Sequence, residues 1–211
     1  MNYYYSSLTP GQTYHLFTQS NGSELLFREN ENYLYFLRKL EKYLRPIADI
    51  YAYCFLPGQL DLVVKIKAED EIRKRFHTCH PFERYRSSMV HGFLMKQVSN
   101  MLNSYSKGYN SRYDRKGSLF RDYIKRVEMV ANDHLKATIS HIHEKPVLLG
   151  YVDQSEDWNW SSLRELTANA PPVINISSML ESFGGKDEFW RYHANDRAFR
   201  ATRLLNIQLA S

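Results

Sequence analysis

The sequence of 211 residues predicts an α+β fold in which helices cover one face of an antiparallel sheet. Three observations predict this class. Aromatic and β-branched runs alternate along the chain with segments whose apolar residues recur every three or four positions. Turns that carry Pro and Gly separate neighbouring apolar runs, as hairpins require. Hydrophobic residues make up 43% and charged residues 24%, a balance typical of a folded globular domain.

The first third of the chain predicts a strand, a helix and a hairpin. Residues 13–19 are aromatic and β-branched and follow a Pro-Gly pair, so they predict a first strand. Apolar residues at helical spacing then run from Asn30, a suitable N-cap, to Pro46, which stops the helix. Residues 47–55 and 60–66 are two apolar runs joined by Leu-Pro-Gly-Gln, which predicts a hairpin.

The middle of the chain predicts two further helices and a strand. Residues 68–85 are polar and show no period, so we expect irregular structure there. Residues 89–105 carry apolar side chains at helical spacing, and Gly108 is placed to end that helix. After a basic turn, residues 121–130 predict a fourth strand. Asn132 then caps a last core helix that stops at the proline at position 146.

The resulting order, β-α-β-β-α-β-α, is the split βαβ pattern of ferredoxin-like folds with one extra helix. We expect this domain to span residues 1–168. The composition shifts after two consecutive prolines, and residues 169–211 predict a short helical C-terminal extension. Because exposed aromatic side chains at such density are uncommon, we expect the extension to pack on the domain. The aromatic residues concerned are Phe189, Trp190, Tyr192 and Phe199.

Charge is unevenly placed along the chain. Between Arg84 and Arg126 there are ten Lys or Arg and two Asp, a local net charge of +8 in a chain whose total is +5. A basic block in an otherwise near-neutral protein indicates a polyanionic partner, most often nucleic acid. A solvated basic helix face is the other interpretation of the same block.

Several classes of protein are excluded. No run of 18 apolar residues predicts a transmembrane helix, and no basic segment followed by an apolar run predicts a secretory signal. Cys54 and Cys79 lie in unlike contexts, which predicts no disulfide framework and a reducing compartment. We therefore expect a cytoplasmic protein with no membrane partner.

Four segments carry a family resemblance. Residues 109–120 read YNSRYDRKGSLF, residues 141–147 read HIHEKPV, and residues 156–162 read EDWNWSS. Residues 183–189 read FGGKDEF. In this order they resemble segments of the HUH-type single-tyrosine transposases, a family of mobile-element proteins, and in particular the REP-associated tyrosine transposase group. The resemblance implies a ferredoxin-like domain that recognises single-stranded DNA hairpins.

In active members of that family, two histidines of a hairpin hold a divalent metal and a tyrosine on the last helix attacks a DNA phosphate. Here the histidine slots of the family's LPNHFHLLL hairpin hold Gln59 and Asp61. The tyrosine slot holds His141, and a slot one helix turn further on, an Asn in the family, holds Lys145. The resemblance therefore implies that no catalytic set is intact, so we expect an inactive relative and no cofactor. Mg²⁺ or Mn²⁺ would be needed only by an active enzyme with divergent ligands.

Lys145 would repel a divalent cation, and we expect its ammonium to replace the cation beside Asp61, about 4 Å away in an ion pair. His141 and His143 are interpreted as polar helix residues satisfied by neighbours rather than as ligands. One cluster, at residues 77–80, has metal-capable side chains, but zinc sites usually pair two such clusters. We therefore predict no metal site.

The basic turn and the strand after it supply the residues expected to contact DNA. Cationic groups meet phosphates, and aromatic faces stack on unpaired bases. The predicted set is Arg112, Tyr113, Arg115, Lys116, Arg121, Lys125 and Arg126. Phe120 is expected to be a core residue, whereas the sequence leaves open whether Tyr113 anchors the turn or faces DNA.

Three functions follow from these observations. The first is a transposase-like protein that binds single-stranded or hairpin DNA without cleaving it. The second is an active metal-dependent transposase or single-strand nuclease with divergent catalytic residues. The third is a decayed remnant with no DNA function. The residues leave the choice between a monomer and a homodimer open.

Overall fold

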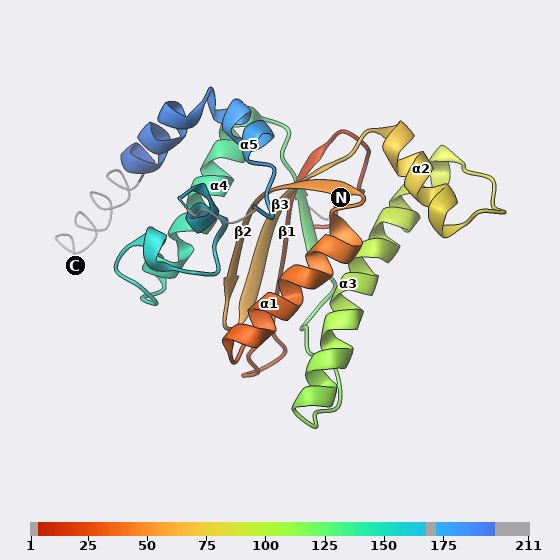
Figure 1. Cartoon of the computed structure of the whole chain (residues 1–211), viewed down its shortest axis with the longest axis horizontal. Coiled ribbons are helices and arrows are strands. Elements are labelled where there is room, and N and C mark those ends of the chain that lie inside the picture. The colour runs from red at the N-terminus through yellow and green to blue at the C-terminus, as the bar shows by residue number, and fades with distance from the viewer. Residues whose placement is uncertain (1–3, 168–171, 197–211) are drawn as a thin grey trace.

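A computed structural model describes residues 4–167 and 172–196. Its centre is a four-stranded sheet with strand order β2-β3-β1-β4, in which all neighbours are antiparallel (Figure 1). The strands are β1 (Thr13–Gln19), β2 (Ala48–Leu56), β3 (Gln59–Ile66) and β4 (Lys125–Glu128). The predicted hairpin is β2 and β3, and the predicted fourth strand forms over four residues only. The chain is therefore an α+β protein with an antiparallel sheet.

The helices are α1 (Asn30–Lys39), α2 (Glu69–Cys79), α3 (Val90–Arg112), α4 (Asn132–Leu148) and α5 (Ile176–Phe183), and residues 186–196 are also helical. Short helical turns are η1 (Leu40–Leu44), η2 (Ser87–Met89), η3 (Ser155–Asp157) and η4 (Ser162–Leu166). None of the helices in the described ranges is both long and apolar enough to cross a membrane.

α1 and α3 cover one face of the sheet, as predicted. The Phe36 ring of α1 packs edge-on against Phe55 of β2 and Tyr105 of α3, with ring centres 5.1 Å and 5.0 Å apart. Successive residues of a strand point to opposite faces, so Leu60 faces this core while its neighbour Asp61 faces away from it.

α4 lies on the other face, which corrects the expectation that helices cover one face only. Its side chains Ile139 and Ile142 are fully buried, and Lys145 reaches Asp61 on that second face. β2 is accordingly buried from Ile50 to Leu56 without alternation. A strand covered on both faces loses the alternating pattern that marks a half-exposed sheet.

The expectation of irregular structure at residues 68–85 was wrong, because α2 forms there. Its only buried side chains are Ile72 and Phe76, one helical turn apart, which is too few to give a visible period. Three acidic residues in its first turn favour the helix electrostatically.

Gly108 does not end α3, which continues to Arg112. A Cβ at this position would collide with the Tyr35 ring of α1, with Cε1 2.8 Å away. The glycine therefore permits close contact between two helices. Similarly, α4 continues past Pro146 to Leu148.

The described part of the C-terminal extension, residues 172–196, packs on the domain through aromatic rings. Phe189 is fully buried, 4.9 Å from the Phe183 ring and 6.1 Å from the His143 ring of α4. Trp190 and Tyr192 are partly buried against the same core. Phe199 lies outside the described residues, as does the expected boundary between residues 168 and 169.

Candidate functional site

Asp61 is the central residue of the site, because its carboxylate lies within the sheet with only 1% of the residue exposed. It is paired with Phe17 of β1 on one side and with Cys54 of β2 on the other. An ionised carboxylate at such a position loses its hydration and needs partners on both oxygens.

Both oxygens of Asp61 have a partner. Lys145 Nζ donates to Oδ2 at 2.5 Å, and His15 Nε2 lies 2.9 Å from Oδ1. The ion pair predicted between Asp61 and Lys145 is therefore present. Burial raises the pKa of Asp61, but the hydrogen bond from His15 and the charge of Lys145 outweigh burial and hold that pKa below its usual value.

This arrangement does not fit a divalent cation. Mg²⁺ and Mn²⁺ need several oxygen or imidazole ligands with free lone pairs. At Asp61 one oxygen accepts from an ammonium and the other faces an imidazole. In addition, no group of three or more His, Cys, Asp or Glu gathers as a metal site within the described part of the chain.

Two of the three histidines of α4, His141 and His143, have different surroundings. His143 is fully buried, with Nδ1 3.0 Å from His193 Nε2 and Nε2 2.8 Å from Ser162 Oγ. It is thus satisfied by neighbours, as predicted, and it joins α4 to η4 and to the C-terminal helix. His141, at the slot where the resemblance implies a tyrosine, lies on the exposed side of α4 one turn before Lys145.

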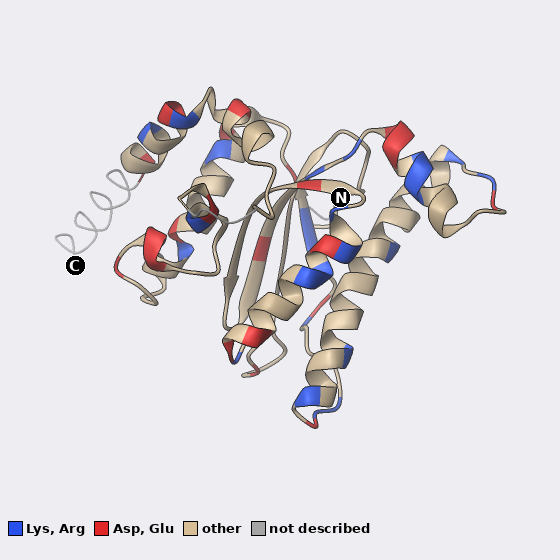
Figure 2. Ribbon diagram, viewed as in Figure 1, with Lys and Arg blue, Asp and Glu red and all other residues tan. Residues whose placement is uncertain are grey.

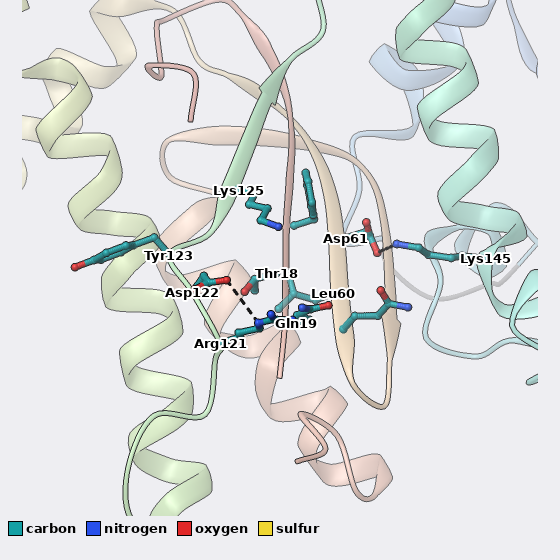
Figure 3. A pocket seen from close by; sticks show the side chains of 11 residues that line it. Thr18, Gln19, Leu60, Asp61, Arg121, Asp122, Tyr123, Lys125 and Lys145 are labelled. Atoms are coloured by element: carbon teal, nitrogen blue, oxygen red, sulfur yellow. Dashed lines mark hydrogen bonds and ion pairs between the residues drawn. The ribbon is translucent and has the colours of Figure 1, made fainter. Parts of the chain in front are cut away.

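A small pocket brings Gln59, Asp61 and Lys145, three of the four slots at which the resemblance implies a change, next to part of the predicted DNA-binding set. Figure 3 shows Arg121 and Lys125 pointing into the space in front of β1, with Asp61 and Lys145 at its other side. The lining residues are Phe17, Thr18, Gln19, Gln59, Leu60, Asp61, Arg121, Asp122, Tyr123, Lys125 and Lys145. Gln59 and Asp61 thus lie in one pocket with Arg121 and Lys125, which are 60 or more residues further along the chain.

Arg126 is a correction to the predicted DNA-binding set. It is 7% exposed, and its guanidinium donates to the carbonyls of Ser6, Ile124 and Tyr5 at 2.9, 3.1 and 3.3 Å. Its position in β4 turns it away from Lys125, its neighbour in the strand. Arg126 holds the N-terminal segment against the sheet and is not available to DNA.

Three further members of the set shape the basic turn. Arg115 donates to Asn110 Oδ1 at 3.0 Å and to the Ser118 carbonyl at 2.9 Å, and it forms an ion pair with Glu24. Tyr113 and Arg112 both bind Glu29.

The hydroxyl of Tyr113 also donates to Asn32, and the guanidinium of Arg28 lies 4.5 Å from its ring centre. These contacts make Tyr113 an anchor of the turn. Phe120 is buried, as predicted, and Gly117 has a φ of +91°, a conformation that favours glycine.

Arg112 stays exposed beside Glu29, whereas Lys116, Arg121 and Lys125 are the cations of the set without a close carboxylate partner in the described residues. Lys116 is exposed and, within the described residues, has no ion-pair partner. Arg121 makes only a long contact of 3.9 Å with Asp122, both side chains being mostly exposed. Lys125 Nζ lies 5.3 Å from the ring centre of Tyr4 and 5.8 Å from that of Phe17, which places its charge at the pocket.

Comparisons with known proteins give one informative result. No family model and no curated protein sequence matches the chain. The fold resembles that of a known transposase. The solved structure is that of a REP-associated tyrosine transposase bound to a REP hairpin, with a TM-score of 0.52 and 15% identity over 82% of this chain and 90% of that one. At this identity the match establishes a similar fold.

Sequence reasoning missed His15 as a partner of Asp61. The signal was present in β1, where Tyr14 and Leu16 alternate with His15 and so place it on the opposite face. Only the register of β1 against β3 brings that face to Asp61, and the sequence does not specify this register.

Proposed function

We propose that the protein is a transposase-like DNA-binding protein that recognises single-stranded or hairpin DNA and does not cleave it. The fold similarity to a transposase bound to a hairpin supports the choice of partner. The four sequence segments that resemble the same family support it independently.

The observation that carries the proposal is the shared pocket of Arg121, Lys125, Lys145 and Asp61. Lys145 neutralises the buried carboxylate, so the two other cations are left to attract an anion. A DNA phosphate is an anion of suitable size and charge for an open basic pocket, and phosphate contacts dominate the affinity of proteins for DNA.

The side chains at the altered slots support the absence of cleavage. His141 has no phenol to form a phosphotyrosine bond, and the oxygens of Asp61 are engaged by Lys145 and His15. The site therefore provides binding groups without the nucleophile and metal ligands implied by the family resemblance. A DNA partner and two free cysteines fit a reducing, cytoplasmic compartment.

A binding and cleavage assay in one tube tests this proposal. Labelled hairpins with flanking single strands are incubated with the full chain across a salt series, with and without Mg²⁺ and Mn²⁺. We expect salt-sensitive binding that is the same with and without metal, and no covalent adduct. The double variant Arg121→Gln/Lys125→Gln is expected to reduce the slope of log K against log salt by about 1.5.

The matched control is Lys42→Gln/Lys186→Gln, which removes the same charge from two exposed positions outside the pocket. It is expected to leave the slope nearly unchanged. A metal-dependent covalent adduct would show an active enzyme instead. No binding at low salt would leave the decayed remnant as the remaining function.

A further inference from the structure

The connection between α2 and α3 presents a fully exposed aromatic ring. Residues 80–87, here named the Phe82 loop, carry Phe82 with 100% of its surface exposed. Exposing a phenyl group to water is unfavourable by roughly the amount that its burial would gain. Nothing in the local packing requires a phenylalanine there, so this side chain is free to contact a partner.

Three arginines line an open hollow of about 400 Å³, and four of the six lining residues belong to the Phe82 loop. Arg73, Arg84 and Arg86 line it together with His77, Tyr85 and Ser87. All three guanidinium groups are exposed, and within the described residues none has an ion-pair partner.

One carboxylate, that of Glu69, is held against the lining of the hollow and keeps its negative charge. The carboxylate of Glu69 accepts from the hydroxyls of Ser87 and Tyr85 at 2.9 and 3.3 Å. The Arg73 guanidinium lies 5.2 Å from the centre of the Tyr85 ring, which keeps it at the rim of the hollow. Three guanidinium groups against one carboxylate leave the surroundings of the hollow with an excess of positive charge.

The hollow is separate from the pocket at Asp61 and from the basic turn. α3 has 23 residues and is therefore about 34 Å long. Its N-terminal end follows the Phe82 loop and its C-terminal end enters the basic turn (Figures 1 and 2). The block of basic residues that is continuous in the sequence thus forms two cationic regions at opposite ends of a helix.

We propose that the Phe82 loop binds an unpaired DNA strand that continues from the site of the proposed function, on which this inference rests. The guanidinium groups of Arg73, Arg84 and Arg86 contact its phosphates, and the Phe82 ring stacks on a base. Cations beside an exposed aromatic face are the combination that single-stranded nucleic acid requires. An acidic peptide would use the charges but would gain little from the ring.

The test measures the affinity for two labelled probes by fluorescence anisotropy. One probe is a hairpin without a tail, and the other is the same hairpin with a tail of roughly 15 thymidines. We expect Phe82→Ala to weaken binding of the tailed probe by about 5- to 150-fold and to leave the tailless probe unchanged. We expect Arg84→Gln/Arg86→Gln to reduce the salt slope for the tailed probe by about 1.4.

Lys42→Gln/Lys186→Gln serves again as the control with equal charge change. Equal affinity of wild type and Phe82→Ala for the tailed probe would overturn this inference while hairpin binding upheld the proposed function. If polyglutamate competes as effectively as oligothymidine, the partner of the Phe82 loop is an acidic polypeptide and the inference of a DNA strand is wrong. If the wild-type protein binds neither probe, the proposed function and this inference are both overturned.

Discussion

Asp61 lies inside the sheet with a donor on each carboxylate oxygen, whereas Arg73, Arg84 and Arg86 face solvent around an open hollow. Burial explains the difference. A charge removed from water must be compensated within the protein, but an exposed charge is compensated by water and ions. The Asp61 site therefore contributes to the stability of the fold, and the Phe82 loop is free to serve binding.

The largest expected effect follows from breaking the buried pair. Lys145→Met leaves the Asp61 carboxylate with His15 alone, and we expect the free energy of unfolding to fall by about 3 kcal/mol. Urea denaturation monitored by circular dichroism measures this change. Lys125→Met is the control, because Lys125 lines the same pocket without an ion pair in the described residues, and it should change stability by no more than about 0.5 kcal/mol.

The double variant Asp61→Asn/Lys145→Met sharpens the same comparison. It removes both charges, so the penalty of an uncompensated carboxylate disappears. We expect it to be more stable than Lys145→Met alone. Equal or lower stability of the double variant would contradict a mainly electrostatic role for the pair.

The next effect is a dependence of stability on pH through His143. Burial and the neighbouring His193 hold the pKa of His143 well below its usual value. In the unfolded chain histidine binds a proton near pH 6.5, whereas folded His143 stays neutral there. Stability is therefore full above about pH 6.5 and falls at lower pH by up to about 1.4 kcal/mol per pH unit.

Urea denaturation between pH 7 and pH 5.5 measures this slope, and His143→Gln is expected to reduce it. An unchanged slope in that variant would assign the titration to another group. The arginines of the Phe82 loop keep their charge throughout this range, so they contribute nothing to the slope.

A smaller loss is expected in stronger acid through Asp61. Its pKa in the folded protein is lowered, so the unfolded chain binds a proton first as the pH falls. The stability that the carboxylate contributes is present above about pH 3.9 and is lost as the pH falls through the folded value. Acid titration of Asp61→Asn should show a weaker loss of stability below pH 4 than the wild type does.

The smallest expected effect concerns the stability of the Phe82 loop variants. Phe82 and the arginines at positions 84 and 86 are exposed, so Phe82→Ala and Arg84→Gln/Arg86→Gln should unfold within about 0.5 kcal/mol of the wild type. Urea denaturation under the binding buffer checks this. A larger loss would mean that the loop stabilises the fold, and any loss of DNA binding would then have a structural cause.

Local sequence patterns were sufficient for much of the fold. The elements β1, β2, β3, α1, α3 and α4 could be predicted from the chain, because each of them buries a long apolar stripe or run. α2 escaped prediction because only Ile72 and Phe76 are buried. The Asp61–Lys145 pair could be predicted because both residues replace family residues at recognisable slots.

The sequence by itself determined the α+β class, the order of the elements other than α2, and the excess of positive charge between Arg84 and Arg126. The tertiary structure alone decided which of those charges are accessible. Strand alternation buried Arg126 and left Lys125 partly exposed at the pocket. The length of α3 separates Arg84, which precedes the helix, from Arg112 at its C-terminal end. The tertiary structure also placed His15 beside Asp61, because contacts between residues distant in the chain depend on strand register and helix placement.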